Sequence, residues 1–493
     1  MTKKDKVEKF LCALKRRAIK AKCKKQYEKV MAYVEMASHI NYEYNQKYTD
    51  EDLEKLSTYI ANYLKISYQS KLEQYEKDDK TVLFYDGFGF DMRGVASIYL
   101  SALLKNGYHV VYVTSKSRDR EIPNIKKMLS MYHADYRLID TSISYIKWAE
   151  DIINVTLQTQ PQAMFFYTTP DDVSGTVAFS VFKDKANRYL IDLTDHAFWL
   201  GTSCNDYFCG SREMSASNQL YERHISRDKL IKLGVNLLIP VSEDHSELPF
   251  DVCRHPYIFS GGLLYKTLGD ENHTYYRIIE YILDHHPKVY FLYAGSGDCT
   301  QMNKIMQKYP NRAFLVDERK DFYYLIENCL LYLNTYPMFG GMMMKYCANA
   351  KKIPLTLRHN SDSEGLLLNQ TKSRIEYDTY EEMVADIDRL IDDKDYRKFR
   401  EGLLENTIIT EERFINNIKS VIEKQKTDYE HEFLHINTEE FRKEYYNRFE
   451  LKKEKQYLVK RINMCVLKEN KWMIFLCAQM YLGRLKRRIK EHD

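Results

Sequence analysis

The chain has 493 residues, 44% of them hydrophobic and 29% charged, which is enough for two or three domains with their own cores. A formal net charge of only +4 argues against a general nucleic-acid-binding protein. The ten cysteines include no Cys-x-x-Cys pair and no Cys/His cluster with zinc spacing, and no run of eighteen apolar residues occurs. These absences predict a protein of the reducing cytoplasm that has neither a Cys/His zinc site nor a membrane span.

The first part of the chain, residues 1–78, is helical in pattern and contains no glycine or proline. Basic residues are concentrated in residues 3–25, with apolar residues interleaved. A further helix is expected to begin at Thr49, because residues 49–52 resemble a capping box. We therefore predict a helical N-terminal extension.

Continuous apolar runs then alternate with helical stretches. Such runs are typical of parallel strands that are covered on both faces of a sheet. They predict a first Rossmann-like domain over residues 79–250, followed by a polar, proline-containing linker over residues 241–256. The expected strands of this domain are residues 81–85, 109–114, 163–168 and 189–193.

The same alternation begins again after the linker and predicts a second Rossmann-like domain over residues 251–426. A basic helical tail is expected over residues 427–493. The predicted fold class is α/β, with two facing Rossmann-like domains and helical extensions at both ends. The expected strands of the second domain are residues 257–259, 289–293, 313–316, 330–333, 353–357 and 374–377.

Two glycine pairs follow strands of the second domain. Gly261 and Gly262 stand shortly before Lys266, and Gly340 and Gly341 stand where a strand passes into a helix. Glycine allows the backbone to approach a ligand closely, and the N–H groups at a helix start attract anions. Because both loops belong to one α/β domain, we expect a diphosphate between them, which makes a nucleotide-sugar enzyme the leading hypothesis.

These segments carry a resemblance to a known family. The Leu-Tyr-Lys run that ends at Lys266, a strand that ends in Ala-Gly at 294–295, and the run 333–341 resemble the donor-binding half of GT-B glycosyltransferases. Within that group, residues 257–425 are similar to the O-GlcNAc transferases and bacterial protein N-glycosyltransferases. The resemblance implies that Lys266 meets the diphosphate of a UDP-sugar. It also implies that the loop containing Tyr336, Gly340 and Gly341 supplies backbone amides to the phosphates.

One departure from the family concerns the helix after this loop. The family has an aspartate there for the ribose hydroxyls, whereas residues 342–347 read Met-Met-Met-Lys-Tyr-Cys. The sugar and the stereochemical outcome therefore stay open, with inverting transfer favoured. Asp317 and Arg319 follow another strand, where GT-B enzymes hold the base and ribose. They either contact the nucleotide or form a solvated charged turn.

In the first domain, Asp195 and His196 come directly after the expected strand 189–193. Histidine titrates near neutral pH, so His196 is a candidate general base for an acceptor hydroxyl. The spacing His-x4-Gly-x-Ser-x-x-Asp-Tyr is similar to a segment of the same glycosyltransferases. The alternative is a histidine that only stabilises its own loop.

The loop 86–94 leaves the first expected strand of the first domain. We expect Asp86, Gly87, Gly89 and Arg93 to bind the acceptor, with Arg93 meeting an anionic group such as a lipid diphosphate. Asp91 or Asp86 is a candidate base in place of His196. The alternative is a purely structural turn. The loop lacks the spacing Gly-x-Gly-x-x-Gly, so a nicotinamide-dependent dehydrogenase is disfavoured.

The C-terminal residues 472–483 are apolar and residues 484–490 are basic. This pattern suits either the anionic inner surface of a membrane or a helix packed on the protein. The sequence thus predicts a cytoplasmic, peripherally membrane-associated glycosyltransferase with no metal and no cofactor. It would move a sugar from a UDP-sugar to a glycan, lipid-linked or protein acceptor in bacterial surface polysaccharide or glycoconjugate synthesis. The alternatives are a UDP-sugar epimerase of the same fold and a non-catalytic partner subunit.

Overall fold

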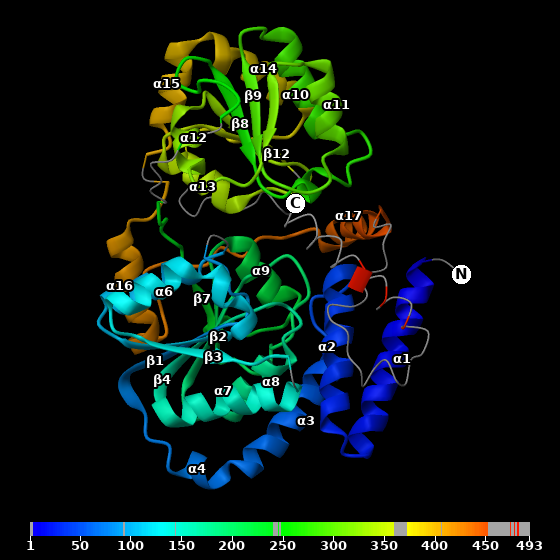
Figure 1. Ribbon diagram of the computed structural model, residues 1–493, viewed down its shortest axis with the longest axis vertical. Coiled ribbons are helices and arrows are strands. Elements are labelled where there is room, and N and C mark those ends of the chain that lie inside the picture. Colours follow the sequence, from blue (N-terminus) through cyan, green and yellow to red (C-terminus); the bar gives the residue numbers. More distant parts are fainter. Residues whose placement is uncertain are drawn as a thin grey trace.

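The computed structural model describes residues 3–451 apart from 92–93, 143, 240–244, 246–247, 359–371 and 406, together with residues 474, 478, 481 and 482. Two parallel sheets, each surrounded by helices, lie one above the other (Figure 1). The predicted α/β fold with two Rossmann-like domains is confirmed.

The first sheet has seven strands in the order β3-β2-β1-β4-β5-β6-β7. Alternate residues of β1 enter two different cores: Val82 and Phe84 pack on one face of the sheet, Leu83 and Tyr85 on the other. All four are buried, which explains why the strand reads as a continuous apolar run. The strands are β1 (Asp78–Asp86), β2 (His109–Ser115), β3 (Asp135–Ile139), β4 (Pro161–Tyr167), β5 (Asn187–Ile191), β6 (Tyr207–Gly210) and β7 (Leu230–Lys232).

The first sheet is covered by helices on both faces. The helices between its strands are α5 (Ala96–Lys105), α6 (Pro123–Met131), α7 (Tyr145–Thr159), α8 (Val173–Val181) and α9 (Glu213–Tyr221). Strands β1, β2, β4 and β5 match the predicted runs to within a few residues. The short strands β3, β6 and β7 were not predicted, because β3 carries polar, partly exposed side chains and the other two are only three or four residues long.

The second sheet has six strands in the order β10-β9-β8-β11-β12-β13. Its two faces are again covered: α10, α11 and α14 pack in one core and α12 in the other, and α13 contributes buried residues to both. The strands are β8 (Tyr257–Gly261), β9 (Tyr290–Ala294), β10 (Ala313–Val316), β11 (Leu331–Leu333), β12 (Pro354–Leu357) and β13 (Glu376–Tyr377). The helices are α10 (Thr274–His285), α11 (Thr300–Lys308), α12 (Phe322–Asn328), α13 (Gly341–Asn349), α14 (Tyr380–Asp392) and α15 (Lys394–Gly402).

The N-terminal extension consists of α1 (Lys3–Cys23), α2 (Tyr27–Tyr44), α3 (Glu51–Ser67) and the short α4 (Gln69–Glu73). The helices α2 and α3 pack against α7 and α8, so the extension shares a core with the first domain. The helix predicted to begin at Thr49 is α3, and its cap is Asp50, which accepts a hydrogen bond from the Asp52 N–H at 3.2 Å.

The chain returns to the first domain after α15. Helix α16 (Glu411–Lys424) buries Phe414, Ile418 and Val421 against α5 and the first sheet (Figure 1). The sequence placed this helix in the second domain, because its amphipathic pattern does not reveal which core receives its apolar face. Helix α17 (Thr438–Leu451) then lies against α2.

Among the described residues, no helix combines the length and the apolar character that a membrane span needs. The apolar segment 472–483 and the basic run 484–490 lie outside the described residues, apart from residues 474, 478, 481 and 482.

Candidate active site

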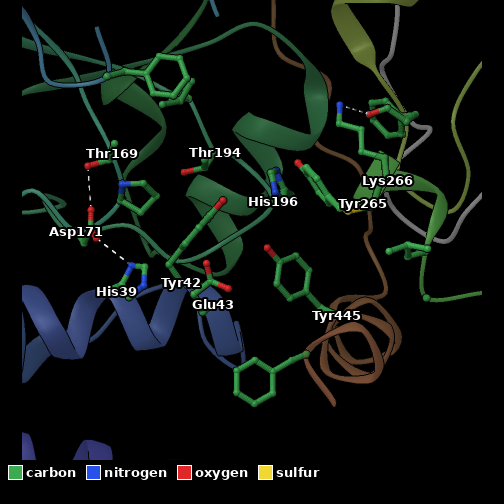
Figure 2. A pocket seen from close by; sticks show the side chains of 18 of the residues that line it. His39, Tyr42, Glu43, Thr169, Asp171, Thr194, His196, Tyr265, Lys266 and Tyr445 are labelled. Carbon is green, nitrogen blue, oxygen red and sulfur yellow. Dashed lines mark hydrogen bonds and ion pairs between the residues drawn. The ribbon is translucent and has the colours of Figure 1, made fainter. Parts of the chain in front are cut away.

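A cavity of about 880 Å³ lies between the two domains and is bordered by helices from both terminal extensions (Figure 2). Its first-domain side is formed by loops that follow β4 and β5, near the place where the strand order reverses between β1 and β4. Ligands of open parallel sheets bind at such positions. The lining residues are His39, Tyr42, Glu43, Phe88, Thr169, Pro170, Asp171, Leu193, Thr194, His196, Arg212, Tyr265, Lys266, Leu268, Gly269, Met338, Phe339, Tyr445 and Phe449.

The second-domain wall brings together two segments that the sequence singled out. Lys266 lies in the short 3₁₀ helix η3 (Leu264–Thr267), and its Nζ donates to the Phe339 carbonyl oxygen at 3.4 Å. The Met338 N–H donates to the Lys266 carbonyl oxygen at 3.1 Å. Phe339 directly precedes Gly340 and Gly341, where α13 begins. Lys266 and the start of α13 are therefore neighbours, as the diphosphate hypothesis requires.

The start of α13 is held in place by a side chain of the preceding loop. The Gly340 N–H donates to Asn334 Oδ1 at 2.9 Å, and no described side chain caps the helix. The first N–H groups of a helix have no partner within the helix, so they are available to an anion. This geometry fits the expected role of Gly340 and Gly341, although Met338 and Phe339 are the residues of this loop that line the cavity.

The other glycine pair, Gly261 and Gly262, allows the turn after β8 to pack closely against the turn after β9. Gly262 has φ +129°, a conformation that favours glycine, and its N–H donates to the Ala294 carbonyl oxygen at 2.9 Å. A Cβ at Gly295 would lie only 1.9 Å from the Gly262 oxygen. Neither Gly261 nor Gly262 belongs to the described cavity lining.

The remaining predicted nucleotide contacts also lie away from the described cavity lining. The Arg319 guanidinium binds the Asp321 carboxylate at 2.7 and 2.9 Å. Asp317 is exposed after β10, and Tyr336 packs against the core of the second domain. The predicted roles of Asp317, Arg319 and Tyr336 in binding the nucleotide stay predictions.

The sequence missed a histidine–carboxylate pair on the first-domain wall. His39 Nδ1 of α2 lies 3.1 Å from Asp171 Oδ2, and Thr169 Oγ1 donates to Asp171 Oδ1 at 2.9 Å (Figure 2). Asp171 is only 3% exposed. An Nδ1–H donated to Asp171 leaves His39 Nε2 as a proton acceptor, the arrangement used by histidine bases in catalytic triads. The polar residues that follow β4 could have indicated Asp171 as a site residue. Nothing in the sequence indicates that α2, which carries His39, packs beside them.

The predicted base His196 does line the cavity, but its neighbour Asp195 is engaged elsewhere. The Arg212 guanidinium binds Asp195 through two hydrogen bonds, one of them from Nη2 to Oδ1 at 2.6 Å. Burial alone would raise the pKa of Asp195, but the charge of Arg212 holds it well below its usual range. Asp195 is therefore a permanent counterion and a poor proton acceptor. It lies 3.5 Å from His196 Nδ1.

Arg212 also connects the two domains. Its guanidinium lies over the Phe339 ring at 5.1 Å from the centroid, and the buried Lys345 of α13 lies close enough to interact with Arg212 and Asp195. Burial, and then the charge of Arg212, lower the pKa of Lys345 to about 8, against the opposing effect of Asp195. Lys345 belongs to the run in which the resemblance leads one to expect an aspartate. At this part of the interface between the two domains, the chain therefore has the cationic Lys345 in place of an acidic residue.

The N-terminal extension holds the loop that carries His196. Asn45, which ends α2, donates from Nδ2 to the His196 carbonyl oxygen at 3.1 Å and accepts from the Phe198 N–H at 3.0 Å. Glu54 of α3 accepts from the N–H groups of residues 201–203 at 2.7 to 3.2 Å. The residues of the Gly-x-Ser spacing, which resembles the glycosyltransferase family, therefore bind Glu54 through their backbone N–H groups.

The loop after β1 reaches the cavity through Phe88. Asp86 is fully buried and accepts from the Gly89 N–H at 2.6 Å and the Tyr112 hydroxyl at 2.7 Å, and burial raises its pKa to about 6. A Cβ at Gly87 would lie 2.0 Å from Thr168 Oγ1. These contacts fix the shape of the loop, and among its described residues Phe88 is the one that lines the cavity.

The loop has two other charged residues, Asp91 and Arg93, and the structure describes the first of them. Asp91 accepts from the N–H groups of Asn124 and Ile125 at 2.5 and 2.9 Å, so it stabilises the first turn of α6. Asp91 is not among the described residues that line the cavity. Arg93 lies outside the described residues.

Comparisons with known proteins identify the fold. No family model matches the chain, and no curated protein matches it in sequence. A glycosyltransferase from Rickettsia africae is 11% identical, with a TM-score of 0.52, and the match covers 71% of this chain and 99% of that one. An O-GlcNAc transferase from Thermobaculum terrenum is 13% identical, with a TM-score of 0.45, over 90% of this chain and 82% of that one.

A third match is the UDP-GlcNAc 2-epimerase of Neisseria meningitidis bound to UDP-GlcNAc, which is 14% identical with a TM-score of 0.45. It covers 70% of this chain and 98% of that one. Identities this low establish the architecture and leave the reaction to be argued from the site. The predicted resemblance in fold is confirmed: the chain has the GT-B fold.

Proposed function

We propose that this protein is a glycosyltransferase that moves a sugar from a nucleoside diphosphate, most simply UDP, to an acceptor hydroxyl. One observation carries the proposal. Lys266 and Phe339, which directly precedes the start of α13, line one wall of the cavity, and the imidazoles of His39 and His196 line the first-domain wall. A cation beside free helix amides suits a leaving diphosphate, and an imidazole suits the acceptor proton.

The donor is placed with its diphosphate between Lys266 and the N-terminus of α13. As the bond between the anomeric carbon and the diphosphate oxygen breaks, its electron pair passes to the diphosphate. The Lys266 ammonium and the α13 amides stabilise the negative charge that develops there.

On the opposite wall, an imidazole removes the acceptor proton while the acceptor oxygen forms a bond to the anomeric carbon. We assign this role to His39, because the Asp171 carboxylate orients its imidazole. His196 is the second candidate, but its carboxylate neighbour is already neutralised by Arg212. A single displacement of this kind inverts the configuration at the anomeric carbon.

We include two further points in the proposal. The reaction needs no metal ion, since Lys266 and the α13 amides provide the positive charge, so activity is expected to survive EDTA. The acceptor belongs to the glycans or glycoconjugates of a bacterial surface, which are assembled from cytoplasmic nucleotide sugars.

The test is product analysis by mass spectrometry. The protein is incubated with UDP-glucose, UDP-galactose or UDP-N-acetylglucosamine and a panel of glycoside acceptors. A product one sugar heavier than its acceptor, together with free UDP, is the expected result. Epimerised UDP-sugar formed without an acceptor would establish the epimerase instead. A protein that turns over no donor but copurifies with an active transferase would be the non-catalytic subunit.

A further inference from the structure

One end of the cavity is built by the two terminal extensions. Tyr42 and Glu43 come from α2 near the start of the chain, and Tyr445 and Phe449 come from α17 near its end. From these residues we propose that α2 and α17 form a subsite for an uncharged sugar acceptor. The proposal rests on the glycosyltransferase function proposed above and adds to it the chemical class of the acceptor.

Helix α17 is firmly attached at both ends. Arg442 forms an ion pair with Glu222, and Thr438 Oγ1 donates to the same carboxylate at 2.8 Å. Toward the other end, Lys3 Nζ donates to the Phe449 carbonyl oxygen at 2.7 Å, and the Phe449 ring packs 5.4 Å from that of Tyr44. The helix is therefore a fixed wall of the cavity, so its aromatic side chains have defined positions.

Three tyrosines from distant parts of the chain converge in this subsite. Figure 2 shows Tyr42, Tyr265 and Tyr445 around one space, with His196 beside them. The Tyr445 ring lies 6.3 Å from that of His196. Burial raises the pKa of Tyr42, and the nearby Tyr445, Glu43 and Tyr265 raise it further.

The Tyr265 side chain is 51% exposed, although it is large and aromatic. Exposed aromatic faces at a cavity are suited to a ligand with an apolar surface, and phenolic hydroxyls are suited to polar edges. A sugar ring has both features, because its C–H groups form apolar faces and its hydroxyls form the rim. The combination of tyrosine rings and hydroxyls therefore favours a sugar over a purely aliphatic chain.

The charges of the cavity divide between its two walls. Lys266 and Arg212 lie on the side of Phe339, whereas Glu43 and Asp171 lie on the side of α2. An acceptor with a phosphate or carboxylate would meet like charge from Glu43, which disfavours its binding. An uncharged sugar can instead donate hydroxyl hydrogen bonds to that carboxylate. The subsite therefore discriminates against anionic acceptors, including the lipid diphosphate suggested by the sequence.

The test measures binding of small glycosides to the UDP-loaded, full-length protein by saturation-transfer NMR. The uncharged probes are 4-nitrophenyl glycosides of glucose, galactose, mannose and N-acetylglucosamine. The anionic probes are 4-nitrophenyl glucuronide and farnesyl phosphate, and a serine- and asparagine-containing peptide represents protein acceptors. We expect at least one uncharged glycoside to bind about tenfold more tightly than the glucuronide.

Four variants connect this result to the subsite. Tyr445→Ala is expected to weaken the preferred glycoside about tenfold, and Tyr445→Phe to weaken it less, because the ring remains. Glu43→Gln removes the charge at constant shape and should reduce the gap between glycoside and glucuronide. Lys443→Ala, an exposed change on the same helix, should bind like the wild type. All four are expected to bind UDP normally, which also shows that they are folded.

Three outcomes would overturn the proposal: no uncharged glycoside binds, an anionic or peptide probe binds better than all of them, or Tyr445→Ala binds glycosides unchanged. Each of these can occur while the wild type still binds UDP, in which case the glycosyltransferase function stands. Failure of the wild type to bind UDP would contradict the proposed function itself, and the acceptor subsite with it.

Discussion

The two walls of the cavity are encoded in different ways. The second-domain wall comes from two short segments, residues 265–269 and 338–339, each of which follows a strand of its own domain. The first-domain wall combines α2, loops after β1, β4 and β5, and α17, which lie far apart in the sequence. Under the proposed function, donor binding would depend on local motifs, whereas acceptor binding and proton transfer would depend on how the terminal extensions pack against the first domain.

The largest effect is expected at His39. In His39→Gln, kcat should fall about a thousandfold, because the acceptor proton has no base. In Asp171→Asn, kcat should fall less than in His39→Gln, because the imidazole remains but loses the carboxylate that orients it. Steady-state kinetics across pH measures both effects. His196→Gln is the comparison: if it lost more activity than His39→Gln, the assignment of the base would be wrong.

On the donor wall, Lys266→Ala should lower kcat/KM about a hundredfold, comparable to removing one oxyanion donor from a preorganised site. The matched control is Lys304→Ala, an exposed lysine on α11 of the same domain. Initial rates with a UDP-sugar measure the difference. Equal rates for the two variants would place the diphosphate elsewhere.

The Asp195–Arg212 ion pair belongs to the first domain, and Arg212 also contacts Phe339 of the second. We expect the pair to stabilise the folded protein. Asp195→Asn should lower the free energy of unfolding by about 3 kcal/mol at pH 7, because it leaves the Arg212 charge without its partner. Since Arg212 holds the pKa of Asp195 low in the folded state, the pair's contribution is present above about pH 4, the unfolded value, and is lost below it. Urea unfolding at pH 7 and at about pH 2.5, which is well below the unfolded pKa of an aspartate, should show the difference between wild type and variant shrinking with acid.

Lys345 is expected to lower the stability of the folded protein, whereas the Asp195–Arg212 pair raises it. Its pKa is lowered to about 8 in the folded protein, so below the unfolded value of 10.5 the unfolded chain binds the proton more tightly. Stability is thus lost as the pH falls from about 10.5 to 8. Lys345→Met should stabilise the protein by about 2 kcal/mol at pH 7 and much less at pH 10. A destabilised Lys345→Met at pH 7 would show that Lys345 has a stronger anionic partner than Asp195.

The smallest effect is expected at Asp91. Asp91→Ala should cost about 1 kcal/mol of stability, because the first turn of α6 loses its acceptor. Asp91→Asn keeps one oxygen acceptor and should cost less. Neither variant should change kcat by more than about twofold. A large loss of kcat in a stable Asp91→Asn protein would restore Asp91 as a candidate base.

The contrast between the walls also explains what the sequence could predict. Lys266 and the loop before Gly340 stand out because a strand, a glycine turn and a helix follow one another within a few residues. His39 lies on a largely buried helix, where nothing local distinguishes it from a core histidine. The amphipathic α16 was predicted as a helix but assigned to the wrong domain for the same reason. Periodicity predicts a buried face, but not what that face contacts.

The most direct test of the central claim is calorimetric titration of the wild type, Lys266→Ala and Lys304→Ala with UDP. A diphosphate held between Lys266 and the start of α13 predicts that the wild type and Lys304→Ala bind UDP equally. Lys266→Ala should bind it at least about tenfold more weakly, as expected for the loss of a charge-assisted contact. UDP binding of equal strength in all three proteins, or no binding of UDP to the wild type, would contradict the claim.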